Sequence, residues 1–230
     1  MELLLNNLVL ILTNLFELYV VYRFMYAFFD ERKYSLKVTG AVYFFRFAIG
    51  TILMIHGTYP VVFMIVSVST LLFITVCYEA SVSKRVVVTI IIWMCMFIAE
   101  IIVGLSIQYA NFSLLHRIEH IDGMISVMIE VLNWIATLLV RRFRNVKRNL
   151  PVPKMLTIAI LFVFVISFYM EMLLFGRPNV NDSIGKISLV FVLSLNFIMI
   201  YIYDSFSRLS DERIKAELIR REKKYYHAQS

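Results

Sequence analysis

Charged residues, proline, glycine and cysteine are all scarce in this chain of 230 residues. Charged residues make up 17% of it, against about 25% in soluble domains. There are only 4 prolines, 7 glycines and 2 cysteines. Cys77 and Cys95 lie in apolar segments and lack the spacing of a disulfide framework or a metal site. We therefore expect two small buried hydrophobic residues, and we predict neither a metal nor a cofactor.

Missing residues also argue against three classes of membrane protein. No lysine lies in the middle of an apolar segment, which excludes a retinal Schiff base. A membrane cysteine peptidase needs a Cys and a His at one depth, whereas Cys77 and His56 fall at opposite ends of their segments. Seven-helix sugar carriers rely on helix-breaking prolines and paired repeats, but here no proline interrupts an apolar segment. No catalytic residue is predicted.

Hydrophobic residues make up 60% of the chain, and the mean hydropathy is +0.78. A helix needs about 20 apolar residues to cross a hydrocarbon core of about 30 Å. The N-terminus lacks the basic region of a signal peptide, so we expect the first segment to be retained. The sequence predicts an all-α membrane protein with seven transmembrane helices, at Asn7–Phe29, Lys37–His56, Tyr59–Tyr78, Val86–Gln108, Gly123–Val140, Met155–Phe175 and Ile184–Asp204.

Lysine and arginine are unevenly distributed between the connections. The segments that follow the first, third, fifth and seventh predicted helices hold 18 of them, whereas the N-terminus and the other three connections hold 3. The positive-inside rule then places the N-terminus outside and the C-terminus in the cytoplasm. Basic loops beside anionic lipid headgroups account for the net charge of +7, so we expect lipid contacts and no nucleic acid.

Two charges are predicted deep in the membrane, at one depth and of opposite sign. Glu17 lies ten residues below the outer end of the first helix, and Arg46 lies ten below the outer end of the second. A charge at the bilayer centre costs at least ~2.5–3.5 kcal/mol, which favours a partner. We predict a contact between Glu17 and Arg46. Its role is either to fix helix packing or to serve function.

The fifth helix carries a polar stripe, because Ser126, Glu130, Asn133 and Thr137 share one helical face. Trp134 flanks that stripe. Polar groups of this kind face protein or water rather than lipid. Two more acids lie in the outer halves of the fourth and sixth helices. We predict an outward-facing ligand site for a group with apolar bulk and a cationic part, built from Glu100, Ser126, Glu130, Asn133, Trp134 and Glu171. The alternative is a set of separate helix-packing contacts.

No proline or glycine separates the last apolar segment from residues 205–230. We therefore expect the last helix to leave the bilayer and continue as a solvated rod. This divides the chain into a seven-helix transmembrane domain at 1–206 and a cytoplasmic linker or dimerisation helix at 207–230. Heptad spacing gives a weak apolar seam that favours either a switchable coiled coil or a solitary solvated helix. The apolar positions of that seam are Leu209, Ala216, Ile219 and Tyr226.

The tail Asp211-Glu-Arg-Ile-Lys-Ala-Glu-Leu-Ile-Arg-Arg-Glu-Lys-Lys-Tyr-Tyr-His-Ala-Gln-Ser follows an all-membrane region rich in Ile, Phe, Met and Tyr. In this arrangement the chain resembles the sensor half of the peptide-pheromone sensor histidine kinases of Gram-positive bacteria, the AgrC-like type with a GHKL ATPase domain. The resemblance implies a quorum-sensing receptor in the bacterial cell membrane. It also implies an extracellular peptide ligand, a homodimer and a two-component response regulator reached only through a kinase domain.

The catalytic parts of that family are not found in this sequence. His227, between Tyr226 and Ala228, lacks the context of the phosphoacceptor histidine, and the ATP-binding boxes are absent. We therefore expect a sensor fragment or a degenerate sensor. The competing hypothesis is a small multi-pass transporter or lipid-interacting protein that uses the intramembrane acids to move a substrate or protons.

Overall fold

The structure, a computed structural model, describes residues 2–56, 60–109, 121–142, 152–175 and 183–229. Within these ranges the chain is all helical and has no strand, which confirms the predicted class. The helices are α1 Glu2–Phe28, α2 Leu36–Ile55, α3 Pro60–Thr75, α4 Val82–Tyr109, α5 Ile121–Arg142, α6 Lys154–Phe175 and α7 Ser183–Gln229.

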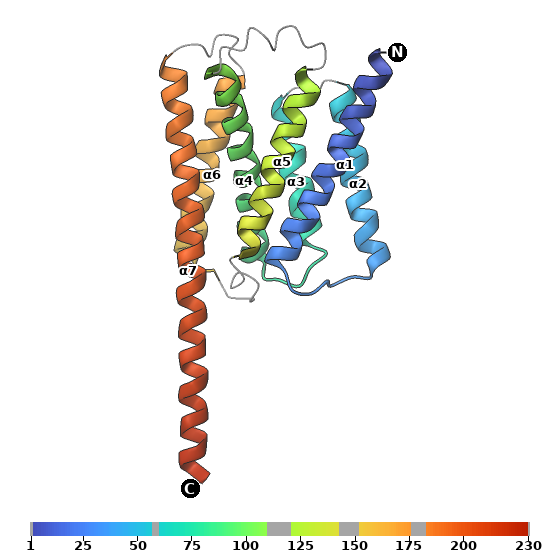
Figure 1. Cartoon of the computed structure of the whole chain (residues 1–230). Helices are drawn as coiled ribbons and strands as arrows, with labels where there is room; N and C mark the ends of the chain where they lie inside the picture. Colours follow the sequence, from blue (N-terminus) through green and yellow to red (C-terminus); the bar gives the residue numbers. More distant parts are fainter. Residues whose placement is uncertain (1, 57–59, 110–120, 143–151, 176–182, 230) are drawn as a thin grey trace.

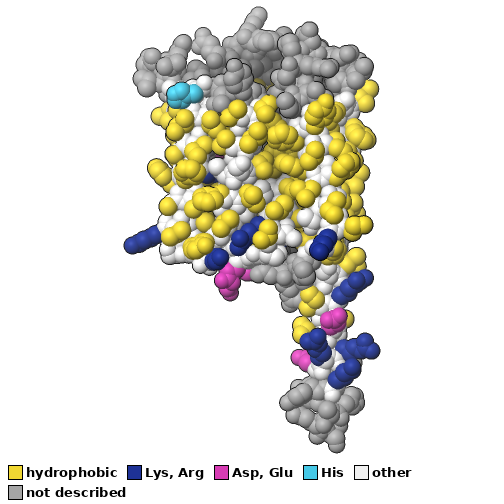
Figure 2. Space-filling view, turned by 180° about the vertical axis from the view of Figure 1, so that it is seen from behind, with side chains coloured by type: hydrophobic (Ala, Val, Ile, Leu, Met, Phe, Trp, Pro, Cys, Tyr) yellow, Lys and Arg dark blue, Asp and Glu magenta, His cyan; other side chains and the backbone are white. Residues whose placement is uncertain are grey.

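Five of the described helices contain a segment long and apolar enough to cross a membrane: Asn7–Phe28, Leu36–Ile55, Val82–Ile107, Gly123–Val140 and Ile187–Glu222. The apolar parts of α3 and α6 are shorter, at Val61–Thr75 and Lys154–Met170. The 16 residues of α3 rise about 24 Å, less than the ~30 Å of a hydrocarbon core. A broad apolar belt covers the bundle in Figure 2, as expected of a membrane-embedded protein.

The helices stand side by side, with the N-terminus at the end of the bundle opposite to the C-terminal part of α7 (Figure 1). Helix α4 lies at the centre and contacts α1, α3, α5, α6 and α7. Helix α1 packs mainly on α5 and α2. Lysine and arginine side chains gather near the end from which α7 projects and along its projecting part (Figure 2).

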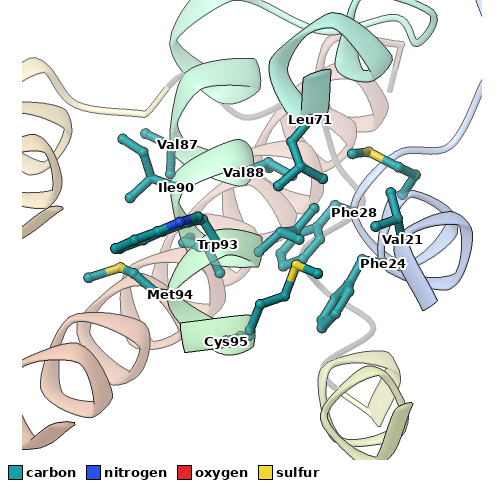
Figure 3. Close-up of a cluster of buried hydrophobic side chains, with 14 of the residues drawn as sticks. Val21, Phe24, Phe28, Leu71, Val87, Val88, Ile90, Trp93, Met94 and Cys95 are labelled. Carbon is teal, nitrogen blue, oxygen red and sulfur yellow. The ribbon is translucent and has the colours of Figure 1, made fainter. Parts of the chain in front are cut away.

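The half of the bundle nearer that projection has a tightly packed apolar core (Figure 3). Phe24 and Phe28 of α1 meet Leu71 of α3 and Val88 of α4, and none of these four side chains is more than 2% exposed. Met94 continues the core toward the middle of α4. Apolar side chains therefore dominate this half, although Thr75, Lys84 and Thr89 are buried there too. Dispersion contacts and apolar burial hold the helices together.

Helix α3 ends at Thr75, three residues before the predicted end at Tyr78. The next three amides bond carbonyls only three residues back, the last being Tyr78 N to Thr75 O at 3.1 Å. An isolated bridge joins Tyr78 to Arg32, and Lys33 N donates to Cys77 O at 2.8 Å. Residues of the connection after α1 thus form hydrogen bonds with the backbone that would otherwise have continued α3.

Helix α7 is a single helix of 47 residues, which corresponds to about 70 Å of rise. The structure thus has the unbroken rod expected from the absence of proline and glycine. In its projecting part Leu209, Ala216 and Ile219 are exposed, whereas the side chain of Tyr226 lies outside the described part. On the bundle, α7 contacts α6 through Ser167 Oγ, which lies 3.0 Å from Asn196 Oδ1. Both side chains are fully buried.

Candidate functional site

A cavity of about 210 Å³ lies among the first five helices. It sits in the half of the bundle nearer the N-terminus, since it reaches the last residues of α2, the first turns of α3 and α5, and the second half of α4. Its polar lining is formed by Thr13, Glu17, Ser67, Glu100, Ser126 and Glu130. Its apolar lining is formed by Met54, Phe63, Met64, Trp93, Met96, Phe97 and Ile129.

Glu17 and Arg46 form the predicted ion pair beside this cavity. Arg46 Nη2 donates to Glu17 Oε1 at 2.5 Å. The other guanidinium nitrogen, Nη1, donates to Ser67 O at 3.0 Å and to Thr70 Oγ1 at 2.6 Å. One guanidinium therefore links α1, α2 and α3. Both charged groups are buried and have lost their hydration, so the attraction between them offsets part of that loss.

Asn14 extends the polar contact between α1 and α2 by one turn. Its Nδ2 donates to Phe47 O at 3.0 Å and to Thr51 Oγ1 at 2.6 Å. Gly50 makes room for the amide, because a Cβ there would lie 3.1 Å from Asn14 Oδ1. Asn14 was not among the predicted contacts. Its position three residues before Glu17, on the same face of the helix, was the available signal.

The polar stripe of α5 faces inward, as predicted from its spacing. Glu130, Asn133 and Thr137 are 7%, 1% and 1% exposed. Asn133 Nδ2 lies 3.4 Å from Glu130 Oε1, a long contact. The other acceptors, Glu130 Oε2 and Asn133 Oδ1, are buried with no hydrogen-bond partner among the described residues. Two buried acceptors on this stripe are thus left unsatisfied, which is costly in a protein interior.

Glu100 brings a third carboxylate to the cavity from α4. Glu17 of α1 and Glu130 of α5 line the same cavity. Arg46 is already bonded to Glu17. Three carboxylates from three helices therefore share one cavity with a single guanidinium at its edge. This arrangement would attract a positively charged group.

Comparison with known proteins finds no matching family model, curated protein or solved structure. Functional inference for this chain therefore depends on the geometry of the cavity and on the resemblance noted from its sequence.

The structure brings together part of the predicted ligand site. Glu100, Ser126 and Glu130 line the cavity, and Asn133 contacts Glu130 beside it. Trp134 does not line the cavity and is 36% exposed. It follows Asn133 directly and so points about 100° further round the helix. The side chain of Glu171 lies outside the described part of the chain.

Several cavity residues were not predicted. Glu17 was treated only as half of an ion pair, although it also contributes to the acidic lining. Thr13 lies one helical turn before it, and this spacing was a usable signal. Trp93 and Phe97 belong to a uniformly apolar segment, where no periodicity shows which side faces a cavity. No group of three metal-binding side chains is found among the described residues.

Proposed function

We propose that this chain is the membrane sensor region of a peptide-responsive sensor histidine kinase in a bacterial cell membrane. The observation that supports this most directly is the polarity of the bundle along its length. One half contains a cavity lined by three acidic side chains, and the other half is packed mainly by apolar side chains. Helix α7 passes beside both halves and projects beyond them (Figure 1). A ligand bound at one end would thus be physically connected to a rod at the other.

A chain of contacts links the cavity to α7. Trp93 lines the cavity and meets two aromatic rings of α6, with centroids at 4.9 Å from Phe164 and 6.2 Å from Phe168. Between these two rings in sequence, Ser167 contacts Asn196 of α7. A ligand that moves Trp93 would press on α6 and so change the buried polar contact with α7. Tightly packed elements of this kind shift between discrete arrangements rather than deform continuously.

Seven crossings with the N-terminus outside complete this proposal. The termini lie at opposite ends of the bundle, which suits an odd number of crossings (Figure 1). Basic side chains gather at the end proposed to be cytoplasmic (Figure 2). In intact cells, an impermeant maleimide should label a cysteine at His56 but not one at Leu218, since both positions are exposed and both native cysteines are buried. Labelling only at Leu218 would reverse the orientation.

Signalling would pass through paired α7 helices of a homodimer. The exposed Leu209, Ala216 and Ile219 would form a weak coiled-coil seam, whose stability a small rotation or shift of α7 could change. A spin label at Glu217 should give a defined distance between subunits in lipid nanodiscs. A chimaera in which a GHKL kinase domain follows residue 230 should then respond to a peptide from a synthetic library. Absence of a pair distance and of any peptide response would contradict the proposal.

The competing function is that of a transporter. Buried acids relay protons in carriers, and the carboxylate oxygen of Glu130 that has no hydrogen-bond partner among the described residues favours this function. The apolar core between the cavity and the other end of the bundle argues against an open path in this conformation. Proteoliposomes distinguish the two functions. A carrier would give substrate or proton flux that Glu130→Gln abolishes, whereas a receptor would give ligand-dependent change at Glu217 without flux.

A further inference from the structure

Two of the three acidic side chains that line the cavity have no basic partner among the described residues. Glu17 is neutralised by Arg46 at 2.5 Å. Neither Glu100 nor Glu130 forms an ion pair within the described part of the chain. Two carboxyl groups therefore face one cavity without a basic side chain of their own. A ligand with a positive charge would supply what is missing.

Glu130 gives the second and independent indication of a ligand. Its side chain is more than nine-tenths buried and lines the cavity, yet Oε2 has no hydrogen-bond partner among the described residues. Hydrogen bonds to charged groups are about twice as strong as those between neutral groups. A donor placed in the cavity would therefore satisfy an acceptor that the described chain leaves open.

The remaining lining indicates what kind of cation fits. Phe63, Trp93 and Phe97 provide apolar and aromatic walls suited to a hydrocarbon stem. The described residues contain no cluster of three metal-binding side chains, so the carboxylates are too dispersed to enclose a small ion. The volume of about 210 Å³ lies below the roughly 300 Å³ at which pockets for drug-sized ligands begin. One side chain fits, whereas a whole peptide does not.

We propose that this cavity binds an organic cation, an alkylammonium or alkylguanidinium group, with its charged end between Glu100 and Glu130 and its stem against Phe63, Trp93 and Phe97. This rests on the proposed function to the extent that the cation would be a lysine or arginine side chain of the peptide ligand. The rest of the peptide would then lie outside the cavity. A free small amine carries the same chemistry, and the experiment below separates the two sources.

Tryptophan fluorescence measures this binding directly, because the chain has 2 tryptophans and Trp93 lines the cavity. Trp134→Phe leaves Trp93 as the single reporter. The full chain in zwitterionic nanodiscs would be titrated with n-butylguanidine, n-butylamine, and the uncharged n-butylurea and n-butanol. We expect saturable changes with the two cations, at affinities at least about tenfold above those of the uncharged analogues. Equal responses to charged and uncharged analogues would overturn the proposal without any further variant.

Matched variants locate the site. Glu100→Gln and Glu130→Gln should each weaken butylguanidine binding about tenfold or more, because each replaces a charge-assisted contact by a neutral one. Glu79→Gln is the control, since it removes the same charge from an exposed connection and should leave binding unchanged. Equal affinities for Glu79→Gln, Glu100→Gln and Glu130→Gln would place the cation elsewhere.

Peptides separate the two sources. An arginine-containing pentapeptide should bind more tightly than its citrulline counterpart if the cavity takes a side chain, whereas binding of free butylguanidine alone would indicate a small amine. The subunit distance at Glu217 tests the receptor function separately. Cation binding without a distance change would retain the site and reject the receptor. A distance change that is insensitive to ligand charge would retain the receptor and reject the cation.

Discussion

Replacing Arg46 by methionine tests how strongly the buried ion pair stabilises the bundle. The substitution keeps most of the side-chain length but removes the guanidinium that links Glu17, Ser67 and Thr70. Glu17 is left as a buried carboxylate without a counter-charge. Breaking a buried pair in this way costs about 3–5 kcal/mol. We expect the free energy of unfolding to fall by that amount.

The partner substitutions complete a double-mutant cycle. Glu17→Gln should cost less, about 1–3 kcal/mol, because Arg46 keeps its bonds to Ser67 O and Thr70 Oγ1. In the double variant neither charge is left unpaired. Its loss should therefore be smaller than the sum of the single losses by about 0.5–3 kcal/mol. Titration of a denaturing detergent into mixed micelles measures each free energy of unfolding.

Arg23→Met is the matched control for this cycle. Arg23 lies in the same helix as Glu17, is only partly buried, and its guanidinium carbon lies 5.9 Å from the centre of the Tyr19 ring. Losing an exposed cation–π contact costs about 0.5–1 kcal/mol. The ion pair would not hold the three helices together if Arg46→Met lowered the free energy of unfolding no more than Arg23→Met does. The same conclusion would follow if the loss in the double variant equalled the sum of the two single losses.

Three further predictions concern packing, pH and the rod. Gly123→Val should destabilise the bundle by about 1–3 kcal/mol, because even a Cβ there would lie 2.9 Å from Val9 Cγ1. A Cβ at Gly104 meets open space, so Gly104→Ala should leave the free energy of unfolding unchanged in the same detergent titration. Burial raises the pKa of Tyr78, whose hydroxyl lies 3.0 Å from that of Tyr43. The contribution of Tyr78 to stability should therefore be constant below about pH 10 and fall above it, because the unfolded chain loses this proton first. Unfolding monitored against pH should show a smaller alkaline loss for Tyr78→Phe than for the unmodified chain, and an equal loss in both would refute this. Leu209→Pro should interrupt α7 at a cost of about 3 kcal/mol and abolish the response of a label at Glu217, whereas Leu209→Ala should retain it.

The resemblance to a sensor kinase and the structural proposals depend on different residues. The resemblance uses the tail after residue 204 and the overall composition. The cavity uses Glu17, Glu100 and Glu130, which no family pattern had indicated. The acidic cavity and the projecting part of α7 lie at opposite parts of one bundle. Either could be rejected by experiment without the other.

Hydrophobic patterning alone determined that this chain is helical and membrane-embedded. Long apolar runs, no proline beyond the first residue of a helix, and basic residues between alternate segments leave few other folds, because backbone polar groups in lipid must be satisfied within each helix. The inward face of α5 also followed from spacing, since Ser126, Glu130, Asn133 and Thr137 recur at helical period. The contact between Glu17 and Arg46 was predicted correctly from their equal depth in the membrane, because the rise per residue of a helix is constant.

Only the tertiary structure decided which residues meet across helices. It joined Glu17 to the acids of α4 and α5, excluded Trp134 from the cavity and ended α3 at Thr75. The central segment of α4, residues 86–99, is almost uniformly apolar and carries no periodic signal, so the rotation of α4 depends on how its neighbours pack around it. Helical period fixes where a side chain lies on its own helix, whereas the packing between helices fixes what that side chain touches.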